Sequence, residues 1–443
     1  MPEGTICAVA TPPGQGGIGV VRLSGPRSRA LTEAIAGPLP APRRASFRRF
    51  ADDDGAVIDE GLVLWFPGPQ SFTGEDVAEL HGHGGPVVMD RLLQRLLGLG
   101  AELAAPGEFS HRAYLNGRMD LTRAEAIADL IEAGSESAAR AAMRSLEGAF
   151  AETVDRLVQR LTERRVHLEA AIDFADEPLE GVALDDEAAR IEAIASDVAE
   201  TRRVAGRGQQ LQEGLSVVIA GRPNAGKSSL LNALAGRDAA IVTSLAGTTR
   251  DVLESYLHLD GLPLRVLETA GLRAGGDVVE QEGVRRARQA MAAADRILLV
   301  HDDTVDGTAD EALATDGWPA AVPVTHVFNK IDRSGRPPGA TDAGIAVSAL
   351  TGDGMMALRE HLRGCLGADD TEAVFIARRR HLQALDTAAR HIDDALNAAR
   401  AGAGEELVAE SLGEAQRALG AITGAVSTED LLGRIFSTFC IGK

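Results

Sequence analysis

The sequence has few cysteines, few aromatic residues and no long hydrophobic run, and these shortages exclude several classes of protein. Its three cysteines, Cys7, Cys365 and Cys440, lie far apart. Their spacing does not suit a metal site, and their small number suits a reducing cytosol. No stretch approaches the roughly 18 apolar residues that a membrane span needs. Residues 1–17 lack a basic start and an apolar core, so we expect no secretory signal and a cytoplasmic protein without membrane contact.

Lysine is scarce, and positive charge is outnumbered by negative charge. The chain has 45 basic and 65 acidic residues and a formal net charge of −20, which argues against a broad basic face that coats nucleic acid. A nucleic-acid partner would need a local patch. Only Lys227, Lys330 and Lys443 are lysines. Because arginine serves wherever any cation will do, a lysine that persists inside a short motif suggests a need for a compact ammonium.

The hydrophobic pattern divides the 443 residues into four stretches, which at about 150 residues per domain indicates two or three domains. Residues 1–117 have mixed α/β patterns, and residues 118–213 have helical patterns. Residues 214–368 alternate strand and helix patterns, and residues 369–443 return to helical patterns and end in a short tail. The simplest arrangement is an α/β domain inserted into a helical domain, because the ends of a domain commonly lie close together. Two independent helical domains are the alternative. Thr122 and Glu125 have the spacing of a capping box at the first helical start.

A nucleotide site is predicted by Gly221–Ser228, which follows a strand-like run and precedes a helical one. The sequence GRPNAGKS is a complete GxxxxGK[ST] phosphate loop. Its glycines let backbone N–H groups approach phosphate oxygens, and the helix N-terminus adds the positive end of its dipole. We expect Lys227 to reach the β- and γ-phosphates and Ser228 to bind Mg²⁺.

The base is predicted by Asn329-Lys330-Ile331-Asp332, which follows another apolar strand run and has the NKxD pattern of guanine-reading loops. The Asp332 carboxylate can accept hydrogen bonds from guanine N1–H and the 2-amino group. Adenine lacks both donors and would leave the carboxylate unpaired. Ser348 and Ala349, after the next strand-like run, resemble the supporting guanine loop. The nucleotide is therefore expected to be GTP.

Two switch segments lie between these motifs. Thr249, in Gly247–Asp251, is expected to supply the second hydroxyl to Mg²⁺. Glu268–Gly271 stands where GTPases have Asp-x-x-Gly, and the longer Glu268 side chain changes the water-mediated hold on the metal. Gly271 is expected to offer its N–H to the γ-phosphate. Leu272 replaces the glutamine that orients water in Ras-like GTPases, so either hydrolysis is weak or other groups position the water.

Other motifs leave alternatives or are rejected. Gly14–Gly19 matches GxGxxG, but a strand-like run follows it, so we reject a dinucleotide site. His81 and His83 are an incomplete metal ligand set. Arg378–Arg380 fits a tRNA contact and a solvated helix start equally well. The last four residues have a CaaX outline that would lipidate Cys440, but Gly442 and a terminal lysine fit it poorly.

Taken together, the motifs resemble the tRNA modification GTPase family MnmE, also called TrmE. The resemblance covers essentially the whole chain and is carried by Thr11–Gly14, Trp65–Gly68, Phe72–Asp76, His81–Gly85, Gly221–Ser229, Gly247–Asp251, Thr269–Arg273 and Phe439–Lys443. It implies an N-terminal α/β dimerisation and tetrahydrofolate-binding domain, a discontinuous all-α helical domain and an inserted Ras-like α/β P-loop G domain. These occupy residues 1–117, then 118–213 with 369–443, and 214–368.

The resemblance also implies site residues. K⁺ would stimulate hydrolysis as the G domains dimerise, held by Asn224, Thr243, Leu245 and Thr248, and Glu280 would position or activate the attacking water. A cation beside the phosphates can neutralise developing charge. The implied GTP contacts are Asn224, Ala225, Gly226, Lys227, Ser228, Ser229, Thr243, Ser244, Leu245, Ala246, Gly247, Thr248, Thr249, Glu268, Thr269, Ala270, Gly271, Asn329, Lys330, Asp332, Ser348 and Ala349.

In the N-terminal domain the resemblance implies a folate site formed by Arg22, Glu79, Arg118 and Lys443, with Cys440 as a reactive thiol. The implied function is modification of the wobble uridine, position 34, of certain tRNAs. A homodimer would work with a flavin-containing MnmG-type partner and add an aminomethyl or carboxymethylaminomethyl group at C5, with folate supplying the one-carbon unit. The alternative is a GTP-dependent switch in ribosome assembly, but we find no appended RNA-binding module for it.

Overall fold

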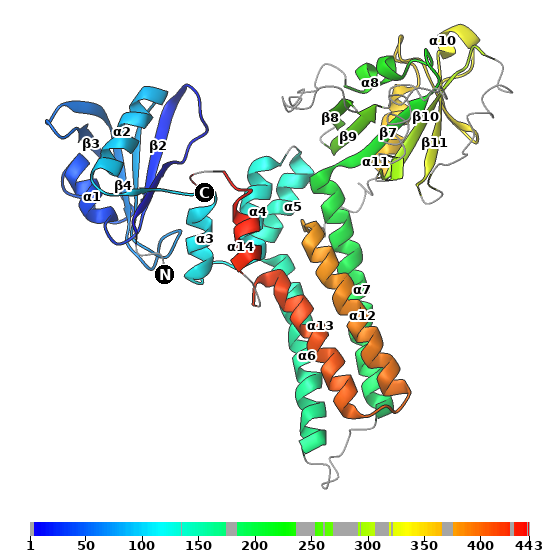
Figure 1. Ribbon diagram of the computed structural model, residues 1–443. Coiled ribbons are helices and arrows are strands. Elements are labelled where there is room, and N and C mark those ends of the chain that lie inside the picture. The colour runs from blue at the N-terminus through cyan, green and yellow to red at the C-terminus, as the bar shows by residue number, and fades with distance from the viewer. Residues whose placement is uncertain are drawn as a thin grey trace, which may run out of the picture. The chain divides into compact units, whose positions relative to one another are not determined.

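The computed structural model forms two compact units (Figure 1). It describes residues 4–133, 135–173, 184–235, 253–259, 262–268, 291–292, 294–305, 319, 322–365, 375–425, 429–440 and 442. The first unit comprises Met1–Ala128, Leu146–Ile194 and Arg390–Lys443, and the second comprises Asp129–Ser145 and Ala195–Ala389. Within the described residues, no helix combines the length and apolar character that crossing a membrane requires.

The first unit contains a six-stranded sheet in the order β3-β4-β5-β2-β1-β6. Its strands are β1 (Ile6–Val9), β2 (Gly16–Ser24), β3 (Ser46–Ala51), β4 (Val57–Phe66), β5 (Val77–Gly84) and β6 (Glu102–Leu103). β1 and β6 pair in parallel and the other neighbours pair antiparallel. Two helices, α1 (Ser28–Ala36) and α2 (Pro86–Gly98), pack against one face through a core that includes Val63, Leu80 and Leu92.

Alternation along the strands decides which residues lie on the other face of this sheet. Val21 and Leu80 are fully buried, whereas Arg22 and Glu79, their neighbours along the strands, are only partly buried. Arg22 lies opposite Glu79 in the β2–β5 register. The sheet therefore places these two distant residues side by side, away from the helix-covered core.

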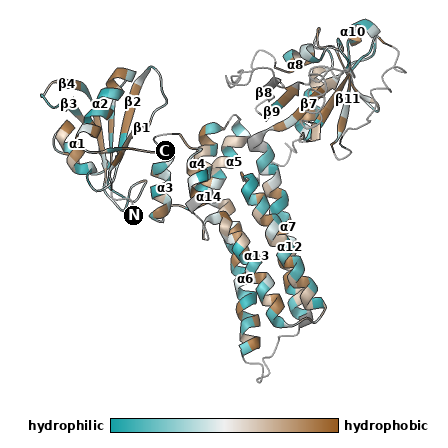
Figure 2. Cartoon of the chain, viewed as in Figure 1, coloured by the Kyte–Doolittle hydropathy of each residue, from teal (hydrophilic) through white to brown (hydrophobic). Residues whose placement is uncertain are grey.

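Eight more helices are α3 (Glu108–Leu115), α4 (Leu121–Glu132), α5 (Glu136–Glu147), α6 (Ala149–Asp173), α7 (Leu184–Glu213), α12 (Arg379–Arg400), α13 (Glu405–Thr423) and α14 (Glu429–Phe436). In Figure 1, α6 lies beside α13, and α7 beside α12. Figure 2 shows hydrophilic and hydrophobic residues alternating along these helices, as expected when only one stripe of each helix is buried.

Two local predictions in the helical part were wrong. The C-terminal tail contains the helix α14, whose Ile435 and Phe436 pack against Leu121. The predicted capping box at Thr122 is replaced by an Asp120 cap, because the Asp120 Oδ1 accepts from the Arg123 N–H at 2.9 Å. Asp120 directly precedes α4, the position from which a side chain caps the free N–H groups of the first turn. Thr122 instead lies inside the helix, and its hydroxyl donates to Asp120 at 2.5 Å.

The second unit contains a seven-stranded sheet in the order β12-β13-β11-β10-β7-β9-β8. Its strands are β7 (Leu215–Gly221), β8 (Leu253–Leu259), β9 (Leu262–Glu268), β10 (Arg296–Asp302), β11 (Val324–Asn329), β12 (Gly339–Thr341) and β13 (Gly344–Val347). The edge strands β8 and β12 pair antiparallel and the five between them run parallel. Helices α8 (Lys227–Ala235), α10 (Ile331–Ser334) and α11 (Met355–Cys365) follow β7, β11 and β13.

In this second sheet the chain order changes direction beside β7. β9 lies on one side of β7 and β10 on the other, so the loop that follows β7 lies at a switch point of the sheet. Ligands of open α/β sheets bind at the carboxyl ends of strands at such points. Two mixed sheets, the helical region and a P-loop α/β unit confirm the predicted multidomain fold class.

Candidate functional site

The phosphate loop joins the end of β7 to the start of α8 through two glycines that no other residue could replace without strain. Gly221 has φ 149° and Gly226 has φ 94°. A Cβ on Gly221 would lie 2.4 Å from the Val300 carbonyl oxygen, and one on Gly226 would lie 2.2 Å from Nδ2 of Asn329. The loop therefore packs tightly on β10 and on the guanine motif, and its backbone is held in one shape.

Lys227 lies inside this loop. Its Nζ donates to the carbonyl oxygens of Gly221 at 2.9 Å and Arg222 at 3.0 Å, and the side chain is buried. A compact ammonium can make these contacts from within the loop, whereas a planar guanidinium is larger. From this position Lys227 can reach the phosphates that the loop binds. Ser228 and Ser229 are exposed in the first turn of α8.

Asn329 connects the phosphate loop to the guanine loop. Its Nδ2 donates to the Ala225 carbonyl oxygen at 2.9 Å, and its Oδ1 accepts from the Ala349 N–H at 3.0 Å. The side chain is only 2% exposed. Because both ends of the amide are used by the protein, Asn329 positions the two loops, and replacing it would leave buried polar groups unpaired.

Asp332 is held at the rim of the site. The Ser348 hydroxyl, which is fully buried, donates to its Oδ1 at 2.6 Å. Asp332 itself is exposed. The hydrogen bond orients a carboxylate toward the space outside the sheet, where it can accept from the N1–H and 2-amino groups of guanine.

Lys330 joins the guanine motif to the phosphate loop and also contacts Asp302, a residue that no sequence motif marks. Its Nζ donates to the Asn224 carbonyl oxygen at 2.7 Å and pairs with Asp302. Partial burial raises the pKa of Asp302. Hydrogen bonds from Lys330 and Thr304 together lower it by a larger amount, so the pKa lies below its ordinary value. Asp302 ends β10 beside the carboxyl end of β11, which is the signal that could have identified it.

Part of the predicted nucleotide site lies outside the described residues. These are the positions Thr243, Ser244, Leu245, Ala246, Gly247, Thr248, Thr249, Thr269, Ala270, Gly271 and Glu280. Glu268 is the last residue of β9, next to β7 in the sheet. The structure therefore brings together the phosphate loop, the guanine motif and the Ser348 loop.

In the first unit, Arg22 and Glu79 form an ion pair, with 2.8 Å between Nη2 and Oε1. The Nε2 of His81 lies 3.1 Å from Oε2 of Glu79, and the Arg22 guanidinium lies 5.6 Å from the Phe72 ring centroid. A hydrogen bond from His81, followed by the charge of Arg22, lowers the pKa of Glu79 despite its burial. The predicted folate residues Arg22 and Glu79 are thus in direct contact.

The C-terminal tail lies on the N-terminal sheet. The Gly107 N–H donates to the Cys440 carbonyl oxygen at 3.4 Å, and a Cβ on Gly442 would lie 2.6 Å from the Val9 carbonyl oxygen. Cys440 is exposed. Lys443 lies outside the described residues. The tail is therefore brought to β1, which pairs with the strand that carries Arg22.

The fourth predicted folate residue, Arg118, is exposed. A Cβ on Gly74 would lie 3.3 Å from its Cγ. Arg118 therefore packs beside the loop that contains Phe72 and Gly74. The Arg22 guanidinium lies over the ring of Phe72 in the same loop.

The other histidine and arginine motifs have protein partners. His81 contacts Glu79, and His83 Nδ1 lies 2.8 Å from Asp59. In the described part of the chain, no group of three or more His, Cys, Asp or Glu residues could hold a metal. Arg378 pairs with Asp129 at 2.7 Å, which favours the structural reading of the arginine run at this position.

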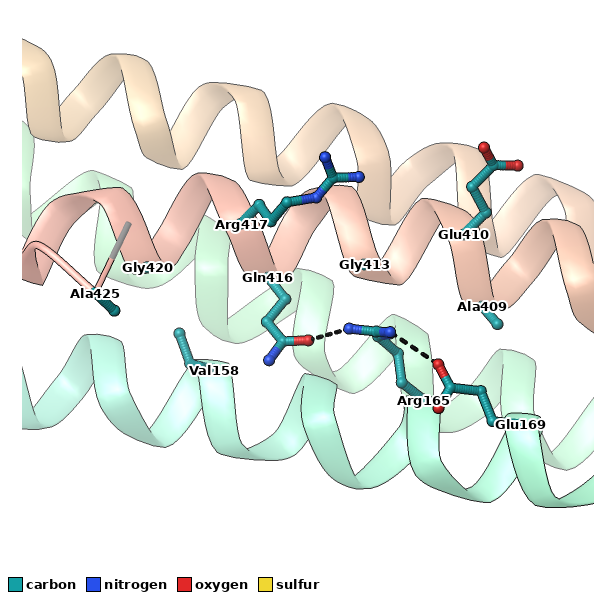
Figure 3. A pocket seen from close by; sticks show the side chains of 10 residues that line it. All are labelled: Val158, Arg165, Glu169, Ala409, Glu410, Gly413, Gln416, Arg417, Gly420 and Ala425. Atoms are coloured by element: carbon teal, nitrogen blue, oxygen red, sulfur yellow. Dashed lines mark hydrogen bonds and ion pairs between the residues drawn. The ribbon is translucent and has the colours of Figure 1, made fainter. Parts of the chain in front are cut away.

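A cleft of about 360 Å³ lies between α6 and α13 (Figure 3). Two of its charged groups, Arg165 and Glu169, pair with each other. Arg165 donates to Gln416 at 2.7 Å and to Glu169 at 2.8 Å. None of the predicted site residues lines this cleft.

Comparisons with known proteins cover the whole chain. Family models described as "MnmE helical domain" and "GTP-binding protein TrmE N-terminus" match residues 121–440 and 5–118. The tRNA modification GTPase MnmE of Alkalilimnicola ehrlichii is 56% identical over 100% of both chains. The protein of the same name from Stutzerimonas stutzeri is 54% identical over 99% of both. A solved structure of an Aquifex aeolicus Era variant bound to GDP and AlF4⁻ is 26% identical, covers 40% of this chain and 66% of its own, and has a TM-score of 0.27.

Proposed function

Because this chain belongs to the MnmE family of tRNA modification GTPases, we propose that its GTP hydrolysis serves modification of the wobble uridine, position 34, of certain tRNAs. The observation that supports the choice of nucleotide is the Asp332 carboxylate, which Ser348 orients at the rim beside the phosphate loop. The chemistry adds an aminomethyl or carboxymethylaminomethyl group at C5 of the base. An MnmG-type, FAD-containing protein is the partner.

In the proposed G domain, residues 214–368, Mg²⁺ is held by the hydroxyls of Ser228 and Thr249. Ser228 lies exposed at the start of α8, where a metal beside bound phosphates would be. Residues 214–368 also contact the nucleotide through the GTP-binding residues that the motifs and the family resemblance imply. Glu280 positions the attacking water, and a metal at Ser228 would neutralise charge on the phosphate oxygens.

We assign the K⁺ ligands to Asn224, Thr243, Leu245 and Thr248. Asn224 supports this assignment because Lys330 engages its backbone carbonyl at 2.7 Å, while its exposed side chain has no hydrogen-bond partner within the described residues. Its backbone has φ 65°, a left-handed conformation that Asn tolerates. The amide oxygen therefore remains available as a cation ligand beside the phosphate loop.

The proposed folate site uses Arg22, Glu79, Arg118 and Lys443 of an N-terminal domain spanning residues 1–117, within a homodimer. Cations suit the glutamate tail of a tetrahydrofolate and a carboxylate suits the N–H groups of its pterin. The contact of the tail at Gly442 with β1 supports a role for Cys440 near this site. The helical domain, residues 118–213 and 369–443, connects this domain to the G domain.

Nucleoside mass spectrometry of tRNA from a strain that lacks the gene tests the proposal. We expect the C5 substituent of the wobble uridine to disappear and to return with the wild-type gene. Wobble uridines that keep their C5 substituents in the deletion strain would overturn the proposed modification.

Steady-state GTP hydrolysis in KCl and in NaCl at matched ionic strength tests the role of K⁺. We expect strong acceleration by K⁺ alone. An Asn224→Ala variant should bind nucleotide and lose this response, because only the side-chain ligand is removed. Equal rates in the two salts for the wild-type protein, or equal K⁺ stimulation in the variant, would overturn the assignment.

A further inference from the structure

An arginine-rich edge of the first unit's sheet has no part in the roles described above. Residues 34–51 contain four arginines and no aspartate or glutamate, in a chain whose formal net charge is −20. Arg48 and Arg49 lie on β3, and Arg43 and Arg44 lie three and two residues before its first residue, Ser46. We call these four arginines and Phe47 the arginine edge. It is a local basic patch of the kind that an acidic protein needs to bind a polyanion.

β3 is the last strand on its side of the sheet and pairs with β4 alone. Phe47 is 62% exposed on this strand and lies opposite Leu62, which is 39% exposed. An exposed aromatic ring on an open edge is costly to leave in water, and arginines stand on both sides of it in the sequence. Because side chains alternate along a strand, Phe47 shares its face of β3 with Arg49, and Arg48 lies on the other face of the same open edge.

Most of the positive charge of this edge is not neutralised. Arg43 donates to the Gln70 carbonyl oxygen, and Arg48 donates to that of Phe47 at 3.0 Å. Carbonyl contacts orient a guanidinium without cancelling its charge. The side chain of Arg44 has no hydrogen bond or ion pair within the described part of the chain.

The paired charges mark the limits of the edge. Arg49 is offset by Glu60, with 2.7 Å between Nε and Oε1. At the far end of β3, Asp52 pairs with Arg91 at 2.9 Å. Once the Arg49–Glu60 pair is set aside, Arg43, Arg44 and Arg48 remain, with a local charge of about +3 along the edge.

The chemistry of the edge fits RNA better than a second copy of the chain. Guanidinium groups bind phosphates, and an exposed aromatic side chain stacks on an unpaired base. Antiparallel pairing of two β3 edges in a register centred on Arg48 and Arg49 would bring arginines opposite arginines, and like charges directly opposite destabilise a sheet. Single-stranded loops of a folded RNA present both phosphates and unstacked bases.

We propose that the arginine edge is a tRNA-binding surface, on which Arg43, Arg44 and Arg48 contact backbone phosphates and Phe47 stacks on an unstacked base. This inference rests on the proposed function, which makes tRNA the substrate. The phosphate contacts supply affinity that depends on salt, and the stacking contact supplies affinity that does not.

Binding of the full-length protein to an unmodified tRNA transcript, measured by fluorescence anisotropy over a series of KCl concentrations, tests the proposal. The double variant with Arg44→Ala and Arg48→Ala should flatten the slope of log affinity against log salt by about 1.4 to 1.8, since each phosphate contact contributes about 0.7 to 0.9. Phe47→Ala should weaken binding about 5- to 150-fold with the slope unchanged.

Arg29→Ala is the matched control. It removes another exposed arginine of the same domain, but one that Glu33 already neutralises at 3.3 Å. Both the affinity and the slope should stay at the wild-type values. GTP hydrolysis without tRNA should be the same in all variants, because no residue of the edge belongs to the nucleotide site.

Three results would overturn the inference. One is a double variant with the wild-type salt slope and affinity. Another is a variant that binds tRNA normally but sediments as a smaller species, which would make the edge a self-association surface. The third is aggregation with normal tRNA binding by the soluble fraction, which would mean that the arginines only protect an open strand. Nucleoside analysis of the deletion strain tests the proposed function separately.

Discussion

The two sheets place their candidate sites in different ways. In the second unit, parallel strands end at one edge, and the site forms from the loops that follow β7, β11 and β13. In the first unit, antiparallel strands place the paired side chains of Arg22 and Glu79 on one face, 57 residues apart in the sequence. One site is largely made of backbone and the other of side chains.

This difference decides how far a sequence motif can identify each site. A loop that binds phosphate through its backbone needs glycines at fixed positions, such as Gly221 and Gly226. Those constraints remain local and form a motif. A pair across two strands depends on the register, and nothing near Arg22 in the sequence specifies Glu79 as its partner.

The largest expected effect is on the backbone-built site. Lys227→Ala should lower GTP hydrolysis about 100- to 1000-fold, the cost of removing a preorganised donor from developing charge. The variant also loses the contacts to Gly221 and Arg222. Steady-state kinetics measure the loss of hydrolysis, and nucleotide binding measures the effect of the lost contacts within the loop. A variant that keeps hydrolysis within tenfold of wild type would show that the loop backbone alone stabilises the phosphates.

Asp332→Asn should exchange the base preference. The amide can donate to the C2 carbonyl of xanthine, whereas the carboxylate accepts from the 2-amino group of guanine. We expect GTP affinity to fall about 10- to 150-fold, as for a lost charged hydrogen bond, and affinity for xanthosine triphosphate to rise. Competition binding with both nucleotides measures the change. If the preference for GTP persists, Asp332 does not read the base.

Glu79→Gln should destabilise the first unit by about 1–3 kcal/mol at neutral pH, because a mostly buried charged hydrogen bond is lost. The pKa of Glu79 is below its ordinary value of 4.5, so the ionised carboxylate stabilises the fold above that pH. This stabilisation disappears as the pH falls below it. The variant should therefore show a weaker loss of stability in acid.

Fluorescence of Trp65, which is buried on β4, reports thermal unfolding of this sheet once the second tryptophan, Trp318, is replaced by phenylalanine. The dependence of the unfolding midpoint on acid pH is compared between two proteins that both carry Trp318→Phe, one with Glu79 and one with Glu79→Gln. Identical acid dependence in the two proteins would mean that the Arg22–Glu79 pair does not stabilise the sheet.

The smallest effect is expected at His111, whose ring lies 4.8 Å from that of Phe436 on α14. Burial lowers the pKa of His111 below its ordinary value of 6.5. The neutral ring therefore stabilises the fold above that pH, and the stabilisation is lost as the pH falls below it. His111→Phe should flatten the pH dependence of the Trp65 midpoint between about pH 7 and 5. A wild-type midpoint that is constant over this range would contradict the prediction.

Much of the second unit could be predicted from sequence. The phosphate loop, the guanine motif and the Ser348 loop each follow a recognisable apolar strand. Since the carboxyl ends of parallel strands share an edge, their order along the chain was enough to predict that they meet. The contacts confirm this, because Asn329 bonds to both Ala225 and Ala349. The helical stretches were also predicted, since periodicity is a local property.

Other features were decided only by the tertiary structure. Asp302 became the partner of Lys330 because β10 and β11 are neighbours, and α14 formed because Leu121 covers its apolar side. The arginine edge emerged when β3 became the last strand of its sheet. Sequence alone determines features that depend on neighbouring residues, such as loop conformation and periodicity. Strand order, register and burial depend on contacts between distant segments, and these determined the remaining features.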